Sequence, residues 1–273
     1  MEDAGERRSE KLIGIGLNKQ AKRYFPERWM PGGVVLTILV AWEILSSAGK
    51  VSQLFFPSPS TVVETFFRLL AGGELAPNIA ATLSRVFLGF ITGGLAGLIL
   101  GLCMGWSRRL RTAVDPVVAA FHAVPKIALL PLIMILFGIG ETSKVVVIAV
   151  AAFFPMLINA MAGVRQISPI HFEVAENYRA TSIKVFTRVI FPGSLPMVLA
   201  GARLTLNVSL LLTIAIELIS AQEGLGAMIW LAWETLRTEE LYVGIAIAAF
   251  LGIGFNFILQ RAAHYLTPWR TDL

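Results

Sequence analysis

The sequence predicts an all-α integral membrane protein with six transmembrane helices and both termini in the cytoplasm. Of the 273 residues, 56% are hydrophobic and 15% are charged, whereas soluble domains contain about 25% charged residues. The apolar residues are gathered in long blocks, as transmembrane helices require. Lys and Arg residues are unevenly shared between the segments that connect these blocks.

Six apolar blocks are long enough to cross a bilayer, which takes about 20 residues. We assign the spans to residues 31–48, 78–105, 112–137, 142–163, 197–221 and 241–262. The third span contains Pro116, Pro125 and Pro131, which predict a break in its helix. Such a break is tolerated where neighbouring helices or water satisfy the freed backbone groups. It indicates either burial beside a pathway or a simple kink.

The orientation follows from the distribution of Lys and Arg, which accumulate in cytoplasmic segments. Sixteen basic residues lie in one set of flanking segments and four in the opposite set. The first set is residues 1–30, 106–115, 164–192 and 261–273; the second is 49–77, 138–144 and 222–240. The first set is therefore predicted to be cytoplasmic, and this topology also accounts for the net charge of +5 without nucleic acid as a partner.

This topology divides the chain into three parts. Residues 1–30 are a cytoplasmic N-terminal segment, with either a short interfacial helix near Leu12–Met30 or a disordered tail before Gln20. Residues 31–266 are the membrane domain and 267–273 a cytoplasmic tail. No cleavable signal peptide is expected. Outside the membrane, PSPSTVVETFFRLL, which starts at Pro57, predicts a short amphipathic helix.

The second span carries a glycine at every fourth position, and these glycines form one slowly winding stripe on a helix. Small residues at such spacing let two helix backbones approach closely in lipid. The stripe is expected to pack within one subunit or at a contact between two subunits. Its members are Gly89, Gly93, Gly97, Gly101 and Gly105.

A charged, helix-forming segment separates the fourth and fifth spans. Ser168 and Pro169 predict a capped helix start. Glu173 and Glu176 are expected in its early turns, where the helix dipole favours acidic residues, and Arg179 and Lys184 come later. Pro192 and Pro196 are expected to end this element and begin the next span. The segment is either a well-capped connection or a docking site.

This segment resembles the EAA loop of permease subunits of binding-protein-dependent ABC importers. That motif reads Glu-Ala-Ala, three residues, Gly and, later, an apolar residue, Leu and Pro. Here Glu173-Val174-Ala175 is followed by three residues and Arg179, and Ile190-Phe191-Pro192 closes the loop. Arg179 thus stands where the family has glycine. The segments FPSPSTVVE, PKIALLPLIMILFGIGETSKV, FFPMLINAMAGV and ELISAQEGLGAMIW are similar to the branch that imports nitrate, sulfonates, taurine and bicarbonate.

The resemblance, which runs from about Val34 to Leu266, implies a type I importer (MetI-like) fold. It implies a permease of a prokaryotic plasma (inner) membrane, paired with a second copy and with an external solute-binding protein. Two cytoplasmic ATPase subunits would hold ATP and Mg, and this chain would bind no cofactor. The loop 166–192 would contact the ATPase, with Glu173 capping or bridging within the loop and Tyr178 and Arg179 filling a groove of the partner. The contact residues implied are Glu173, Ala175, Glu176, Tyr178, Arg179, Ala180 and Lys184.

Several polar residues within the spans are candidates for the translocation path. An acidic residue within a span, such as Glu217, is a functional hypothesis by default. Lys126 could attract an anion. Each of these residues could instead be a hydrogen-bond or ion-pair partner between helices. The candidates are His122, Lys126, Asn159, Asn207, Ser209, Thr213 and Glu217.

The alternative function is a secondary transporter or channel that works without an ATPase. A secondary transporter predicts inverted repeats and acidic coupling residues at mid-membrane, and the sequence shows no clear repeat. An enzyme within the membrane would need a catalytic set of Ser, His, Asp or Glu, which is not seen. The only Gly-Lys pair, Gly49-Lys50, lacks the phosphate-loop pattern. The single cysteine, Cys103, excludes a disulfide framework, and the histidine spacing predicts no metal site.

Overall fold

The computed structural model of the protein describes residues 30–268. The helix expected near Leu12–Met30 and the end of the expected C-terminal tail therefore lie outside the described residues. The described part of the chain divides into two units, one ending at Val51 and the other beginning at Ser52. The first contributes the apolar helix α2 (Met30–Ser47), and the second contributes every other described element.

Five described helices are long and apolar enough to cross a membrane: α2, α4 (Leu75–Trp106), α7 (Glu141–Arg165), α10 (Phe191–Ser220), which continues a helix from Ser182, and α12 (Thr238–Leu266). A sixth span is formed if the bent pair of α5 (Arg108–Ala123) and the helical segment Lys126–Phe137 crosses as one unit. That segment consists of η2 (Lys126–Leu129) and α6 (Leu130–Phe137). The predicted all-α membrane class is confirmed.

The break in the third span is a bend of 89° between Ala123 and Lys126. Val124 precedes a proline and is extended, with ψ 129°, because the proline ring disfavours the helical conformation of the residue before it. Pro125 has no N–H to continue the helix. Pro131 stands in the first turn of α6, where the missing N–H costs nothing. Pro125 therefore marks the break, and Pro131 starts a new helix.

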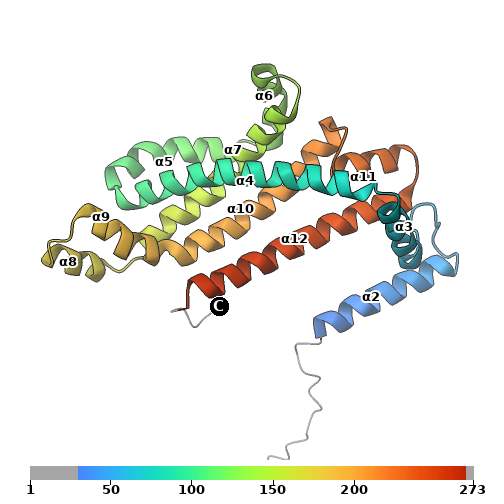
Figure 1. The fold of residues 1–273 in the computed structure, drawn as a ribbon, viewed down its shortest axis with the longest axis horizontal. Coiled ribbons are helices and arrows are strands. Elements are labelled where there is room, and N and C mark those ends of the chain that lie inside the picture. The colour runs from blue at the N-terminus through green and yellow to red at the C-terminus, as the bar shows by residue number, and fades with distance from the viewer. Residues whose placement is uncertain (1–29, 269–273) are drawn as a thin grey trace, which may run out of the picture. The chain divides into compact units, whose positions relative to one another are not determined.

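The centre of the second unit is formed by α4, α7 and α10, which run side by side (Figure 1). The glycine stripe of α4 lies against α7. A side chain added at Gly93 would meet the backbone oxygen of Ala149, and one added at Gly97 would meet that of Phe153. These close approaches are possible only because the stripe has no Cβ atoms. The glycine face is thus covered by α7 of the same chain.

Two groups of short helices lie at opposite ends of these long helices (Figure 1). At one end, α3 (Pro59–Ala71) and α11 (Leu225–Glu234) share an apolar cluster with α4 and α12. The Ser58 hydroxyl caps α3 by accepting the Thr61 N–H at 3.3 Å. At the other end lie α8 (Pro169–Asn177) and α9 (Ser182–Val185). The helix predicted after Pro57 is present, whereas α11 was not expected from the sequence.

Candidate functional site

The charged segment between α7 and α10 forms two short helices, α8 and α9. Ser168 occupies the N-cap of α8 and Pro169 its first turn, but the Ser168 hydroxyl makes no capping hydrogen bond. The serine backbone oxygen instead accepts the His171 N–H at 3.1 Å. The predicted helix start is therefore in place, and the predicted side-chain cap is wrong.

Arg179 provides the turn at the end of α8. Its φ of 49° is in the left-handed region. The Arg179 N–H donates to the Glu176 oxygen at 2.8 Å, and the Ala180 N–H donates to the Ala175 oxygen at 2.8 Å. This pair of bonds is the Schellman arrangement, in which the residue just beyond the helix is usually glycine. The arginine thus adopts a backbone conformation that glycine would adopt without a steric cost.

The acidic residues of the loop do not lie where the sequence suggested. Glu176 is in the last turn of α8, Glu173 is in its middle, and the first turn contains no acidic residue. The expected helix-dipole stabilisation is therefore absent, because that effect is confined to the first turn. Glu173 is exposed and forms no ion pair within residues 30–268. Neither the expected cap nor the expected bridge by Glu173 is observed within the described part of the loop.

The two prolines do not separate the loop from the following span. The segment Phe186–Ile190 is a π-helical turn that leads directly into α10, and the Phe191 N–H donates to the Phe186 oxygen. Pro192 lies in the first turn of α10 and Pro196 lies inside it. A π turn shifts the hydrogen-bond register and accommodates an interruption of the helix. Residues 182–220 consequently form one continuous helical rod.

The loop has an inner face and an outer face. Phe172, Val185 and Phe186 pack against a buried cluster formed by residues of α4, α7 and the start of the rod. The opposite face exposes Ile170, Val174, Tyr178 and Ile183, and Tyr178 is 84% exposed. Exposed apolar side chains on an element that is held from behind are typical of a protein interface. We call these four residues the outer face of the loop.

A second concentration of charge lies at the opposite end of the long helices. Arg85 of α4 is 5% exposed. Its Nε and Nη2 donate to the two carboxylate oxygens of Glu141 at 2.6 and 2.9 Å. Its Nη1 donates to Glu217 Oε1 and to the Glu223 backbone oxygen, both at 2.6 Å. Lys144 donates to Glu141 at 2.8 Å. Arg85, Glu141, Lys144 and Glu217 form a balanced ion cluster.

Glu217 is the most deeply buried member of this ion cluster, at 1% exposed. Besides Arg85, it accepts the Thr82 hydroxyl and the Gly226 N–H at 3.0 Å. The carboxylate therefore holds α4, α10 and the start of α11 together. A side chain at Gly224, where φ is 127°, would collide with this carboxylate. Both carboxylate oxygens of Glu217 accept hydrogen bonds from the protein. A buried charge is stabilised only when it is paired and hydrogen-bonded in this way.

The sequence singled out Glu217 but not its ion-pair partner Arg85, nor Glu141 and Lys144, the other members of the ion cluster. Glu141 and Lys144 lie in the first turn of α7, near a span end, where charged residues are common. One signal was available: Arg85 lies about ten residues into α4, and a cation within a span calls for an anionic partner.

Two of the predicted path residues, His122 and Lys126, line a cavity of about 490 Å³ between the bend of the broken span, α7 and α10. The Lys126 ammonium donates to the backbone oxygens of Phe121, His122 and Val124 at 3.1, 2.6 and 2.8 Å. It also lies 4.6 Å from the centre of the Phe154 ring. All three ammonium hydrogens are thus engaged, and Lys126 bonds to carbonyl groups at and just after the end of α5.

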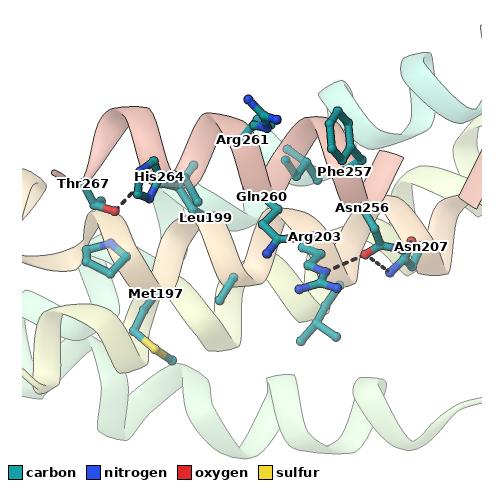
Figure 2. Close-up of a pocket in the computed structure, with 15 residues that line it drawn as sticks. Met197, Leu199, Arg203, Asn207, Asn256, Phe257, Gln260, Arg261, His264 and Thr267 are labelled. Atoms are coloured by element: carbon teal, nitrogen blue, oxygen red, sulfur yellow. Dashed lines mark hydrogen bonds between the residues drawn. The ribbon is translucent and has the colours of Figure 1, made fainter. Parts of the chain in front are cut away.

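The remaining polar candidates bond mainly to their own helices. Asn159 donates to the Pro155 oxygen at 2.8 Å, and Ser209 and Thr213 donate to oxygens one turn earlier in α10. Asn207 instead reaches α12, where its amide exchanges hydrogen bonds with that of Asn256 at 3.2 and 3.3 Å (Figure 2). The structure does not bring these four residues together into one polar path. The described residues contain no group of three metal-ligating side chains.

Comparison with known proteins agrees with this architecture. Residues 75–272 match the family described as the binding-protein-dependent transport system inner membrane component. The chain is 35% identical to the taurine transport system permease protein TauC of Escherichia coli (strain K12), over 88% of this chain and 90% of TauC. It is 34% identical to SsuC of Bacillus subtilis (strain 168), a protein named for aliphatic sulfonates transport, over 93% of this chain and 94% of that one.

More distantly related proteins are also similar over most of this chain. The nitrate import permease protein NrtB of Synechocystis is 28% identical over 84% of this chain and 86% of its own length. A chain of the MetNI methionine ABC transporter in an inward-facing conformation superposes with a TM-score of 0.64 at 20% identity, over 70% of this chain and 94% of that chain. This likeness shows the shared fold. The protein therefore belongs to the family of inner membrane permease components of binding-protein-dependent ABC transporters.

Proposed function

We propose that this permease imports a small oxyanion-bearing solute of the sulfonate, taurine or nitrate type and couples to its ATPase through the outer face of the loop. Family membership makes the chain a multi-pass permease component whose ATPase is a separate subunit. The relatives named for taurine, aliphatic sulfonates and nitrate transport support the solute class. In the proposed assembly, two copies of the chain work with two ATPase subunits, which hold ATP and Mg, and with an external binding protein.

The observation that carries the coupling proposal is the division of the loop into two faces. Phe172, Val185 and Phe186 fix the loop to the membrane helices, and the outer face leaves Val174 and Tyr178 exposed. An ATPase that binds the outer face pushes on an element that cannot move independently of the helices behind it. Arg179, Glu173 and Lys184 surround this face with charged groups that would set the orientation of the partner.

The continuous helix from Ser182 to Ser220 gives this movement a path across the membrane. Its α10 part contains 30 residues, which corresponds to about 45 Å at 1.5 Å per residue. The ATPase-facing loop lies at one end of this rod, and Glu217, bound to Arg85, lies near the other. We infer that the rod moves as one body and that the ion cluster is its outer anchor. Rearrangement at the loop would then change the packing of α10 along the pathway.

The cavity beside the broken span suits an anionic solute. Lys126 contributes a positive charge to its wall, and the wall residues of this cavity include no carboxylate. Because the three ammonium hydrogens are bound to carbonyl oxygens, Lys126 would act through its charge and not through a direct hydrogen bond. Such a site attracts an anion without holding it tightly, which transport requires.

Two measurements on the purified permease, its ATPase and its binding protein test the proposal. Val174→Asp and Arg179→Glu should each weaken ATPase association, whereas Thr112→Ser, an exposed control in α5, should not. Proteoliposomes should accumulate a sulfonate, taurine or nitrate when ATP is supplied. Normal association and uptake with both loop variants would refute coupling through the outer face. Uptake of none of these solutes would refute the solute class and leave the coupling result unaffected.

A further inference from the structure

A second and larger hollow of about 940 Å³ lies between α10 and α12. Its polar lining consists mainly of Arg203 and Asn207 from α10 and of Asn256, Gln260, Arg261 and His264 from α12 (Figure 2). Met197, Leu199 and Phe257 contribute apolar walls. We call this hollow the α10–α12 groove. Neither the loop contacts nor the Lys126 cavity involves it.

The α10–α12 groove has an excess of positive charge. Its lining contains two arginines and no carboxylate. Arg203 Nε donates to Asn256 Oδ1 at 2.5 Å, and the Arg261 guanidinium lies 5.1 Å from the centre of the Phe257 ring. Both arginines are exposed, and within residues 30–268 neither forms an ion pair. In membrane helices, such cations call for an anionic partner.

The acidic residues of the two helices cannot supply this partner. Within α10 and α12 the only carboxylates are Glu217, Glu239 and Glu240. All three lie toward the ends of the helices opposite to the groove. Glu217 is bound to Arg85, and Glu240 is bound to Arg68 and Arg237. An anion that meets Arg203 and Arg261 must therefore come from elsewhere.

The arrangement of groups along α12 matches the order of groups in a phospholipid. Phe250, Ile253 and Phe257 are large exposed apolar side chains on one face of the helix, and Arg261 follows on the same face one turn later. The distribution of basic residues places the Arg261 end of α12 on the cytoplasmic side. Arg203 lies deeper in the span, where its Nε donates to Asn256, and its side chain is long enough to reach toward the level of Arg261. Cations thus lie at the headgroup level and apolar side chains at the acyl-chain level.

We propose that the α10–α12 groove binds one anionic phospholipid of the cytoplasmic leaflet, whose headgroup Arg203 and Arg261 contact from different sides of α12 (Figure 2). The planar guanidinium groups suit paired hydrogen bonds to phosphate oxygens, and Gln260 and His264 add donors beside them. The acyl chains lie along Phe257 and Ile253. Basic pockets between transmembrane helices on the cytoplasmic side recognise anionic lipid headgroups in this way.

A second copy of this chain fits the groove less well. In a two-fold contact each surface meets itself, so Arg203 and Arg261 would face the same two residues of the other copy. Four cations would then share one contact without a carboxylate. An anionic lipid neutralises the same groups and also covers the apolar walls. The bound lipid would hold α12 against the continuous helical rod of residues 182–220.

The test measures lipid binding to the full-length protein in a neutral detergent, by native mass spectrometry and by thermal stability. The probes are phosphatidylglycerol, phosphatidylcholine and soluble glycerol phosphate. Wild type should retain and be stabilised by phosphatidylglycerol and by neither of the other two. Arg203→Gln combined with Arg261→Gln should weaken phosphatidylglycerol binding on the order of 30-fold, because each arginine near the surface contributes about fivefold.

Arg109→Gln is the matched control, since it removes an exposed cation at the cytoplasmic side of α5 outside the groove; its affinity should stay within twofold of wild type. Equal stabilisation of wild type by phosphatidylcholine would overturn the charge recognition, and this comparison needs no variant. Equal binding of glycerol phosphate would show an anion site and overturn the lipid assignment. Unchanged phosphatidylglycerol binding by the double variant would place the lipid elsewhere.

Discussion

Arg85→Met should destabilise the permease far more than Lys144→Met, although each change removes one cation from the same ion cluster. Methionine keeps most of the apolar volume of either side chain, so the comparison isolates the loss of charge and hydrogen bonds. The structure gives the two cations different partners. Arg85 contacts both Glu141 and Glu217, whereas Lys144 contacts Glu141 alone.

The expected difference follows from the exposure of those partners. Glu217 has a side chain that is 0% exposed, so Arg85→Met leaves a buried carboxylate without its cation. Breaking a buried pair in this way costs about 3–5 kcal/mol. The Glu141 side chain is 60% exposed and keeps Arg85 when Lys144 is replaced. Loss of a partner at such an exposed carboxylate costs up to about 1 kcal/mol.

Thermal unfolding of the purified protein in detergent provides the assay. For a chain of this size, 1 kcal/mol corresponds to about 2–4 °C in Tm. Arg85→Met should therefore lower Tm by roughly 6–20 °C, and Lys144→Met by up to about 4 °C. Arg85→Met combined with Glu217→Met should recover part of the loss, because the unpaired charge is removed. Equal shifts for the two single variants would refute the assignment of Glu217 as the group that depends on Arg85.

Two further changes test close contacts elsewhere in the chain. Gly97→Ala should cost about 1–3 kcal/mol of unfolding free energy, because the new methyl group meets the Phe153 backbone oxygen, whereas Gly94→Ala finds only ordinary contacts and should be neutral or stabilising in the same Tm assay. Arg179→Gly should slow hydrogen exchange of the Ala180 N–H roughly 5- to 30-fold by relieving about 1–2 kcal/mol of left-handed strain, and Arg179→Val should accelerate it. Equal exchange in all three proteins would contradict the strained turn.

The parts of the fold that depend on local composition could be predicted from the sequence. Each predicted span overlaps a helix, because an apolar block of about 20 residues is a strong signal for a transmembrane helix. The break at Pro125 follows from the missing N–H and from the restriction on Val124. The glycine stripe predicted a close contact with another helix. It could not show whether that helix would be α7 of the same chain or a helix of a second subunit.

The parts that depend on distant or marginal contacts could not be predicted. Arg85 lies 56 residues from Glu141 and 132 residues from Glu217, and a single sequence contains no information on which charges meet at such separations. In the loop, Glu176 was placed in an early turn because the end of α8 was not known to within one turn. The π turn at Phe186 allows Pro192 to continue the helix, and no residue pattern indicates it.

The helix α11 was missed for a different reason. Its ten residues are apolar enough for a membrane helix but too short to cross, so they were read as part of an external connection. Gly224, with φ 127°, and the Gly226 N–H, bound to Glu217, fix where this helix begins. These are tertiary constraints, since the carboxylate that receives the N–H comes from another helix.

Site-specific photo-crosslinking tests the central claim, that the outer face of the loop contacts the ATPase, most directly. The photo-crosslinker p-benzoylphenylalanine would replace Tyr178, on the outer face at the end of α8, and, as the control, Phe172 on the inner face of α8. In the assembled transporter, illumination should join position 178 to the ATPase subunit, and position 172 should yield no such product. Crosslinking to the ATPase from position 172, or from neither position, would contradict the account.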